Sequence, residues 1–517
     1  MSSTFNRLLS GGLLRTLTLL ITIVISFFMM PFMVENLGDK TYGLWVLIGS
    51  LMGYYMVVDF GLLSATQRYL ARNLTNTSRL NSVINTAFYL LSILSVIAIV
   101  LTAIFWWIAP LLVSEPNVIP TMQMLIVIMG AKTVLTLPLM VFNGMLSAKL
   151  RFDIAAYIEI GKNILRTALM VGYLLNDYGI ISLALITLLS ELLAFFFITM
   201  CAIKLYPEAS YGAQYIDKAL AKDLFKFGKY TFIGETSNLL KFKVDDIVIA
   251  KYIGLASVTT YAIAFSLFNY AGQFINSLLG GLVTVFTTSI NDGPEILRKR
   301  FLVFTEICAL VATYFTLFML LAGKSFIILW MGSEYSESFN ILAIFCIILL
   351  VNSSTQACVP LFYALAKHKK LAFWNLYEGA INLTISIVLV HKYGITGVAL
   401  GTLIPAIFFR LILQVNYACK LMDLSILKYW QVIVKHWLMG GVFYIAFTYI
   451  DLAPIMDSYI GLITFCGALS FAYILLVCRY FLSDTVKEIL VNNLSNKIPV
   501  GILAVVFKHS PLDRGNI

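Results

Sequence analysis

The chain has 517 residues, of which 60% are hydrophobic and only 12% carry a charge. A soluble protein of this length has about 25% charged residues, so this chain has too few polar side chains to cover a folded surface in water. The composition therefore excludes a soluble globular enzyme, and the net charge of +10 needs a different explanation from a nucleic-acid partner.

Apolar runs of about 20 residues recur along the whole chain, as in polytopic membrane proteins. The first run begins near Leu13 and lacks a small-residue cleavage site, so we expect a retained helix and not a signal peptide. The sequence predicts an all-α polytopic membrane protein with about 14 transmembrane helices. We place them at residues 12–35, 42–70, 82–109, 120–147, 154–176, 180–204, 227–252, 258–289, 302–323, 337–365, 371–391, 395–419, 431–450 and 457–481.

Lysines and arginines are distributed unequally between the two ends of these helices. If the N-terminus lies in the cytoplasm, most of them fall in cytoplasmic loops, and the other side holds Lys40, Lys251, Lys324 and Lys392. This asymmetry follows the positive-inside rule, places both termini in the cytoplasm and accounts for the basic charge without nucleic acid. The basic linker at residues 217–229 is expected to form an amphipathic helix at the membrane surface.

Three sets of motifs recur at nearly the same separation. The sets, each about 215–219 residues apart, are Tyr42…Gly61 with Tyr261…Gly280, Glu159-Asn163-Thr167 with Glu378-Asn382-Ser386, and Tyr178-Gly179-Ile180 with Tyr393-Gly394-Ile395. Because an offset of six helices preserves orientation in the bilayer, we expect two parallel repeats. The predicted parts are a six-helix lobe at residues 1–210, a second six-helix lobe at 211–422, and two further helices with a cytoplasmic tail at 423–517.

Polar and charged side chains follow single faces of several predicted helices. An ion at the centre of a membrane helix costs about 2.5–3.5 kcal/mol on insertion scales, so these faces favour a water-filled cavity between the lobes. Hydrogen bonding between helices is the alternative, and it suits the serines and threonines best. The charged and amide residues predicted on such faces are Arg15, Glu159, Lys162, Asn163, Arg166, Glu235, Lys241, Asn269, Gln273, Asn276, Glu378 and Asn382.

Two further charges lie within apolar segments of the first half. Asp59 comes shortly before Gly61, which permits a local break in the helix, and we expect Asp59 to face the interior and to pair with Arg15 or Arg68. Lys132 lies near the middle of the bilayer.

In the second half, Asp245 and Asp246 are expected either to form an outer gate or to pair with neighbouring lysines. Lys435 lies near a helix end, where we expect it to serve topology.

Motifs for catalysis and for metal or nucleotide binding are absent from the sequence. We find no GxSxG, HExxH, Walker A or Gly-rich nucleotide loop, and the seven cysteines and four histidines are dispersed. We therefore expect no enzyme activity, no metal and no cofactor. An ion gradient or the gradient of the substrate itself would drive transport.

The run LGDKTYGLWVLIGSLMGYYMVVDFGLLSATQRYLAR resembles the opening signature of bacterial polysaccharide flippases of the O-antigen type. These belong to the superfamily of multidrug, oligosaccharidyl-lipid and polysaccharide exporters. The run LFKFGKYTFIGETSNLLKFKVDDIVIAKYIGLASVTTYAIAFSL resembles the start of the second half in the same family. The resemblance extends from about Asn6 to Met422.

This resemblance implies two six-helix bundles around a central cavity, which opens alternately to the two sides of the bacterial inner membrane. It implies transport of undecaprenyl-diphosphate-linked sugar units to the outer leaflet for surface polysaccharide such as O-antigen. Cavity cations would bind the diphosphate, and acids would couple to H⁺ or Na⁺ or act as gates. The cations are Arg15, Lys162, Arg166 and Lys241, the acids Asp59, Glu159, Glu235 and Glu378, and the polar lining Asn269, Gln273, Asn276 and Asn382. If Lys162 and Glu159 neutralise each other, Lys162 is structural.

The sequence is also compatible with other functions. A cation-coupled small-molecule or multidrug exporter of the same superfamily is the main alternative. A membrane-embedded polymerase or ligase would require a long external loop with Arg and His, and none is predicted. Candidate partners are the lipid-linked oligosaccharide, membrane lipids, and polysaccharide polymerase and chain-length proteins, with no nucleic acid.

Overall fold

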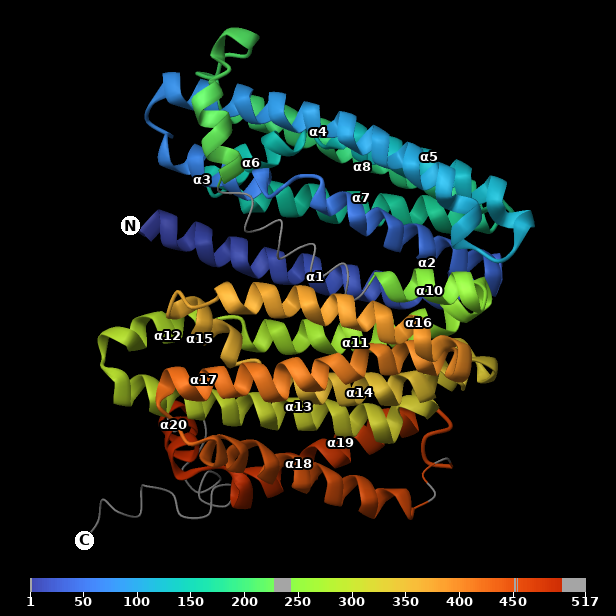
Figure 1. Ribbon diagram of the computed structural model, residues 1–517, viewed down its shortest axis with the longest axis vertical. Coiled ribbons are helices and arrows are strands. Elements are labelled where there is room, and N and C mark those ends of the chain that lie inside the picture. The colour runs from blue at the N-terminus through green and yellow to red at the C-terminus, as the bar shows by residue number, and fades with distance from the viewer. Residues whose placement is uncertain (1, 227–242, 451, 453, 495–517) are drawn as a thin grey trace. The chain divides into compact units, whose positions relative to one another are not determined.

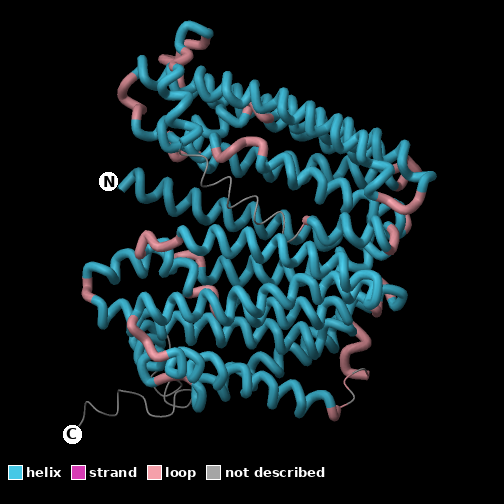
Figure 2. Tube along the Cα trace, viewed as in Figure 1, coloured by secondary structure: helices cyan, strands magenta, loops and turns pink. Residues whose placement is uncertain are grey.

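The computed structural model of the protein describes residues 2–226, 243–450, 452 and 454–494 (Figure 1). Within these ranges, side chains are described except at residues 2–13, 15, 56, 489, 490 and 492–494. The described chain is helical and contains no strand, as Figure 2 shows. It divides into two compact units, Met1–Ala262 with Ser386–Val398, and Ile263–Ile385 with Ala399–Ile517. The predicted lobe boundaries at residues 210 and 422 stay predictions.

Long apolar helices confirm the all-α membrane fold. In the ranges that the structure describes, nine helical segments are long and apolar enough to cross a membrane: Thr16–Leu37, Thr77–Leu112, Pro116–Thr136, Ile180–Leu205, Leu255–Asn291, Pro294–Met331, Ser338–Ala364, Lys369–Met422 and Tyr459–Phe481. Lys369–Met422 covers two of the predicted spans. The remaining predicted spans fall on an interrupted helix, on the more polar helices α7 and α18 and on the incompletely described segment 227–252, so the total of 14 stays a prediction.

The first unit is built from helices that pack both on their neighbours in sequence and on helices far away in the chain. Its helices are α1 (Ser2–Leu37), α2 (Asp39–Gly53), η1 (Tyr54–Val57), α3 (Leu62–Arg72), α4 (Thr77–Leu112), η2 (Pro116–Val118), α5 (Ile119–Thr136), α6 (Met140–Ala148), α7 (Phe152–Leu174), α8 (Ile180–Leu205), η3 (Ala213–Tyr215) and α10 (Val244–Tyr252). Helix α4 packs on α5, and α7 packs on both α1 and α8. Helix α7 therefore lies between two neighbours that can supply partners for its polar side chains.

The second unit is centred on α13 (Pro294–Met331), which packs on α14 and on the C-terminal helices α18 and α19. The other elements are α11 (Leu255–Leu279), which begins in the first unit, α12 (Leu282–Asn291), η4 (Ser333–Tyr335), α14 (Ser338–Ser354), α15 (Cys358–Ala364), α16 (Lys369–Ala406), the π-helix η5 (Ile407–Gln414), α17 (Val415–Met422), α18 (Ile426–Thr448), α19 (Tyr459–Leu476), the π-helix η6 (Val477–Phe481) and α20 (Asp484–Leu494). A buried aromatic core that includes Phe286, Phe301 and Tyr429 joins α12, α13 and α18.

Helix interruptions occur at matched positions of the two repeats. The break between α2 and α3 ends at Gly61, and the break between α11 and α12 begins at Gly280. The short gap between α5 and α6 has its counterpart between α14 and α15, again about 218 residues later. Helix α16 has non-helical backbone at Gly394, the counterpart of Gly179 at the start of α8. The repeat inferred from side-chain motifs is thus also present in the backbone.

Asp59, Phe60 and Gly61 form the turn that breaks the helix before α3. Phe60 and Gly61 both have positive φ, at 50° and 69°, and the carboxylate of Asp59 accepts a hydrogen bond of 2.8 Å from the Gly61 N–H. A positive φ is strained in an L residue and free in glycine, so Gly61 is suited to this turn. Asp59 forms no ion pair among the described residues, so the expected pairing with Arg68 is wrong. The side chain of Arg15 lies outside the described part of the chain, so the pairing with Arg15 stays a prediction.

The glycine of the YGLW motif lies where two helices approach closely. A Cβ atom on Gly43 of α2 would overlap the carbonyl oxygen of Leu255, at the start of α11. Nearby, the hydroxyl of Thr259 donates a 2.7 Å hydrogen bond to the carbonyl of Asp39, so a hydrogen bond joins α2 and α11 beside their close approach. The motif therefore serves helix packing.

The basic linker forms the expected amphipathic helix at residues 218–226. Leu220 and Leu224 are buried, whereas Lys218, Lys222 and Lys226 are exposed. Each set has a spacing of four residues, and the two sets are offset by two residues, which places the leucines and the lysines on separate faces. The remainder of the predicted segment, from residue 227, lies outside the described residues.

Candidate functional site

A cluster of charged side chains lies among the apolar helices of the first unit. Nζ of Lys162, on α7, lies 2.8 Å from Oε2 of Glu159 on the same helix and 3.1 Å from Oε2 of Glu191 on α8. The Lys162 side chain is only 9% exposed, whereas that of Glu159 is 43% exposed. One buried lysine is thus held by two carboxylates, so Lys162 has the structural character that its i,i+3 spacing from Glu159 suggests.

The next turn of α7 carries a second set of polar contacts. Nη2 of Arg166 donates a 3.2 Å hydrogen bond to Oδ1 of Asn163, and Nδ2 of Asn163 donates a 3.2 Å bond to the hydroxyl of Thr22 on α1. Asn163 is buried, and Arg166 is half-buried. No carboxylate among the described residues forms an ion pair with Arg166, so its positive charge remains uncompensated at short range.

Lys132, on α5, is the third cation of this region. It is half-buried and interacts electrostatically with Glu191, Lys162 and Arg166, without an ion pair among the residues that the structure describes. The cluster therefore combines three cations with two carboxylates, Glu159 and Glu191. We call these five residues the cationic cluster.

Glu191 was not selected by the sequence analysis. It is the only acid in the long apolar run of α8, and that isolation is the signal that could have identified it. Its partner Lys162 lies 29 residues earlier, so no local spacing rule connects the two. The prediction on Lys162 considered only Glu159 on its own helix.

The second unit places a charged pair at the repeat-related position. Nε of Arg410, on η5, lies 3.9 Å from Oε1 of Glu378 on α16, and both side chains are largely buried. One turn further along α16, Nδ2 of Asn382 lies 3.3 Å from the hydroxyl of Thr402. The repeated Asn thus contacts another helical segment in both units, whereas the repeated Glu does so only in the second, because Glu159 pairs with Lys162 on its own helix.

The predicted polar lining on α11 lies largely at an exposed surface. Asn269 and Asn276 are exposed and Gln273 is half-buried. Nε2 of Gln356, in the break before α15, donates a 2.5 Å hydrogen bond to Oδ1 of Asn276. This bond joins the end of α11 to the break before α15.

Three predicted site residues cannot be placed. Arg15 lies in α1, but its side chain is outside the described part of the chain, and Glu235 and Lys241 lie outside the described residues altogether. The roles assigned to them stay predictions.

Asp245 and Asp246, at the start of α10, are buried and held by hydroxyl groups. The Tyr261 hydroxyl donates a 2.6 Å bond to Asp245, and the Ser50 hydroxyl donates a 2.5 Å bond to Asp246. Asp246 is also within electrostatic range of Lys243. These contacts connect α10 with α2 and α11.

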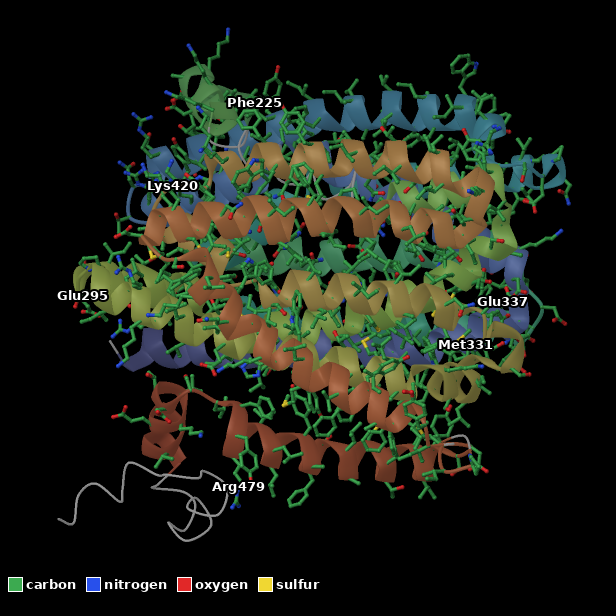
Figure 3. All side chains as sticks on the ribbon, turned by 60° about the horizontal axis from the view of Figure 1, so that its bottom comes forward. Phe225, Glu295, Met331, Glu337, Lys420 and Arg479 are labelled. Atoms are coloured by element: carbon green, nitrogen blue, oxygen red, sulfur yellow. The ribbon has the colours of Figure 1, made fainter. Side chains whose placement is uncertain are left out.

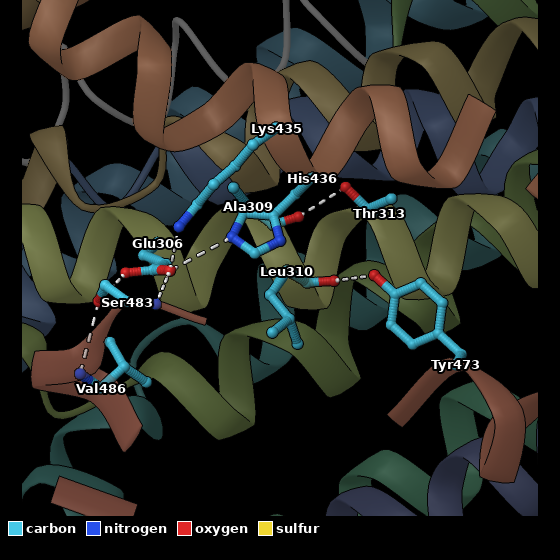
Figure 4. Close-up of polar contacts among 9 residues, drawn as sticks. All are labelled: Glu306, Ala309, Leu310, Thr313, Lys435, His436, Tyr473, Ser483 and Val486. Atoms are coloured by element: carbon cyan, nitrogen blue, oxygen red, sulfur yellow. Dashed lines mark hydrogen bonds and ion pairs between the residues drawn. The ribbon is translucent and has the colours of Figure 1, made fainter. Parts of the chain in front are cut away.

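A buried carboxylate in the second unit was missed as well. Glu306 of α13 accepts hydrogen bonds from Lys435 Nζ at 2.5 Å, from the Ser483 N–H at 2.8 Å and from the Ser483 hydroxyl at 2.5 Å (Figure 4). Nε2 of His436 lies 3.6 Å from the same carboxylate. Lys435 therefore does more than set topology, because it connects α18 to α13.

Comparison of the sequence with known proteins identifies the family of this chain. Residues 37–340, more than half of the chain, match the polysaccharide biosynthesis protein family. This chain belongs to the polysaccharide biosynthesis protein family. The matched range begins just before the YGLW motif and includes α7, α8 and the cationic cluster.

Relatives of this family member are membrane transporters. It is 24% identical over 398 residues to a Shigella flexneri protein named "Putative O-antigen transporter", which covers 75% of this chain and 92% of that one. Its fold is similar to that of the lipid II flippase MurJ in an inward closed conformation, with a TM-score of 0.67, 16% identity, and coverage of 93% of this chain and 99% of the other. It is also similar to an inward-facing multidrug resistance MATE family transporter of the MOP superfamily, with a TM-score of 0.63, 15% identity, and coverage of 84% and 96%. These names describe transporters and not enzymes.

Proposed function

We propose that this polysaccharide biosynthesis protein is a flippase. It moves undecaprenyl-diphosphate-linked oligosaccharide units from the inner to the outer leaflet of the bacterial cytoplasmic membrane. Two lobes enclose a central cavity and open it alternately to either side. The observation that carries this proposal is the cationic cluster, which holds three cations and only two acids within an apolar helical unit.

A diphosphate headgroup fits such a cluster on chemical grounds. Lysine and arginine form short, charge-assisted hydrogen bonds with phosphate oxygens. Lys162 is already held by Glu159 and Glu191, so it positions the cluster. Arg166 and Lys132 form no ion pair among the described residues, and the cluster has a net positive charge, so these two are the groups that bind the diphosphate. Arg15 and Lys241 have the same role in the proposal.

Acidic residues supply the coupling. A carboxylate that exchanges a proton or Na⁺ changes the net charge of the cavity and thereby the affinity for an anionic headgroup. Asp59, Glu159, Glu235 and Glu378 are the proposed coupling or gating acids. The absence of a nucleotide-binding motif from the sequence supports an ion gradient, or the substrate's own gradient, as the source of energy.

Uncharged polar groups would accommodate the sugar. Asn269, Gln273, Asn276 and Asn382 offer amide donors and acceptors, which match sugar hydroxyls better than charged groups do. The Oδ1 atom of Asn276 accepts the hydrogen bond from Gln356, so the amide NH₂ group of Asn276 is available to a ligand.

A multidrug or small-molecule exporter is the second candidate, and the fold similarity to a MATE family transporter favours it. Exporters of organic cations need a cavity that attracts positive charge. The excess of cations in the cluster is the feature that favours the flippase instead. The two functions predict different results when Arg166 is replaced: loss of surface polysaccharide for the flippase, and drug sensitivity in its place for the exporter.

The proposal is tested in a strain that lacks the gene and its surface polysaccharide. Expression of the wild-type chain restores surface polysaccharide, whereas Arg166→Ala, Lys132→Ala, Arg15→Ala and Lys241→Ala reduce it at least tenfold while the protein still inserts into the membrane. Lys324→Ala is the matched control, because Lys324 is an exposed cation of α13 outside the cluster. Normal surface polysaccharide in all four variants removes the diphosphate assignment. Drug sensitivity in place of polysaccharide loss supports the exporter.

A further inference from the structure

A cavity with basic and apolar walls lies in the second unit, at the start of α13. It has a volume of about 460 Å³. It is lined by residues of α13 and α18, by Ser483 just before α20 and by Thr485 in the first turn of α20. Its size lies in the range of roughly 300–1,000 Å³ that is typical of small-molecule sites. The lining residues are Glu295, Arg298, Lys299, Leu302, Val303, Glu306, Lys428, Val432, Ser483 and Thr485.

Two lysines of this cavity have no partner. Among the residues that the structure describes, Lys299 and Lys428 form no ion pair and no side-chain hydrogen bond, and both are exposed. Arg298 is already engaged, because its Nε donates a 2.8 Å bond to the Met422 carbonyl and its Nη2 lies 3.5 Å from Asp423. Lys299 and Lys428 come from different helices, α13 and α18, so a bound anion would connect the two.

Two carboxylates also line the cavity, and only one of them opposes an anion. Glu306 accepts hydrogen bonds from Lys435 and from both polar groups of Ser483, so its charge is compensated (Figure 4). Glu295 is exposed at the beginning of α13. Two unpaired lysines against one unpaired carboxylate leave the cavity with a net positive charge.

Part of the cavity lining is apolar. Leu302, Val303 and Val432 line it together with the lysines. Figure 3 shows Glu295 and Lys420 at one end of the second unit and Met331 and Glu337 at the other. The positive-inside asymmetry assigns the Glu295 end to the cytoplasm. A basic pocket beside an apolar wall at the cytoplasmic interface suits a phosphate attached to an acyl chain better than a phosphate free in water.

We propose that this cavity binds the phosphate headgroup of an anionic glycerophospholipid of the inner leaflet. Lys299 and Lys428 bind the phosphate, Thr485 donates a hydrogen bond to it, and Leu302 and Val432 contact the start of the acyl chains. The bound lipid links α18 to α13. This proposal is independent of the transported substrate, because none of its residues belongs to the cationic cluster.

The test measures lipid binding to the purified full-length protein in detergent micelles by native mass spectrometry. Phosphatidylglycerol is the probe, phosphatidylcholine tests headgroup charge, and glycerol 3-phosphate tests a soluble phosphate. We expect phosphatidylglycerol to bind more tightly than the other two. Replacement of Lys299 and Lys428 by Gln lowers its affinity by about fivefold for each lysine, as expected for a basic residue near an anionic lipid surface.

Two further variants make the result specific. Lys324→Gln removes an exposed lysine near the other end of α13 and is expected to leave phosphatidylglycerol binding unchanged. Leu302→Trp fills the cavity without a change in charge and is expected to reduce binding. Unchanged affinity in the double lysine variant, equal binding of phosphatidylcholine, or equal binding of glycerol 3-phosphate would each overturn the proposal.

Discussion

Nζ of Lys162 lies 3.1 Å from Oε2 of Glu191, so a lysine of α7 and a carboxylate of α8 neutralise each other inside an apolar unit. The same lysine also contacts Glu159. This arrangement separates two kinds of cation in the cluster. Lys162 has carboxylate partners, whereas Lys132 and Arg166 retain charge that a ligand can use.

The Lys162–Glu191 contact can be measured by a double-mutant cycle. We expect Lys162→Met and Glu191→Met to be coupled by about 0.6–2 kcal/mol in the free energy of unfolding, the range for polar contacts between membrane helices. The measurement is reversible unfolding in detergent. A cycle of Lys162→Met with the distant Lys324→Met is the control and should be additive. Additivity of the Lys162 and Glu191 variants would show that the contact contributes nothing to stability.

Gly43 should tolerate no side chain. Gly43→Ala places a Cβ against the carbonyl of Leu255 and should destabilise the protein by about 1–3 kcal/mol, as overpacking does in other cores. Gly49→Ala is the matched control on the same helix, because no atom lies within 4 Å of its Cβ position. We expect thermal unfolding in detergent to occur at a lower temperature for Gly43→Ala only. Equal melting temperatures for the two variants would refute the close approach of α2 and α11.

Asp59 offers a way to separate turn formation from ion coupling. Asp59→Asn keeps an oxygen that can accept the Gly61 N–H, so its stability should stay within about 0.5 kcal/mol of the wild type. Asp59→Ala removes that acceptor and should cost about 0.5–1.5 kcal/mol. If Asp59 also couples transport to an ion, Asp59→Asn loses gradient-driven transport without a loss of stability. Wild-type transport by a stable Asp59→Asn protein would leave Asp59 with the turn alone.

Glu306 should be essential for the attachment of the C-terminal helices. Glu306→Ala leaves the half-buried Lys435 and the Ser483 N–H without their partner, which should cost about 1–3 kcal/mol, the range for an unsatisfied polar group. Hydrogen exchange should then increase in α18 and in the segment before α20, and much less in the first unit. The double variant Glu306→Leu with Lys435→Met should recover most of the stability, because it removes both charges. A uniform increase in exchange across both units would contradict this role.

Much of the fold could be predicted because membrane helices are encoded locally. Runs of apolar residues, the basic loops and the repeated motifs at Glu159 and Glu378 all lie within short stretches of sequence. The helix interruptions follow the same offset, since Gly61 and Gly280 both lie at one, and the two repeated lobes stay a prediction. The short gaps near residues 137–139 and 355–357 were not predicted, although Pro138 lies in the first gap and Pro360 follows the second. Proline cannot donate a backbone hydrogen bond within a helix, so these prolines were the available signal.

The charged contacts could be predicted only in part. Glu159 and Lys162 are three residues apart on one helix, so their pairing follows from helix geometry. Glu191, Arg410 and Lys435 meet their partners through tertiary packing, which a single sequence does not encode in any spacing. Isolated acids in apolar runs, such as Glu191 and Glu306, were the available signal.

The proposed flippase function depends most directly on the binding of a lipid-linked diphosphate by the cationic cluster. The decisive measurement is the rate at which the purified protein, reconstituted in vesicles, moves a fluorescent undecaprenyl-diphosphate-linked oligosaccharide between leaflets. We predict fast movement by the wild type and by Lys324→Gln, and a rate at least tenfold lower for the double variant Lys132→Gln, Arg166→Gln. Movement by that variant at the wild-type rate, or no movement by the wild type above protein-free vesicles, would contradict the account.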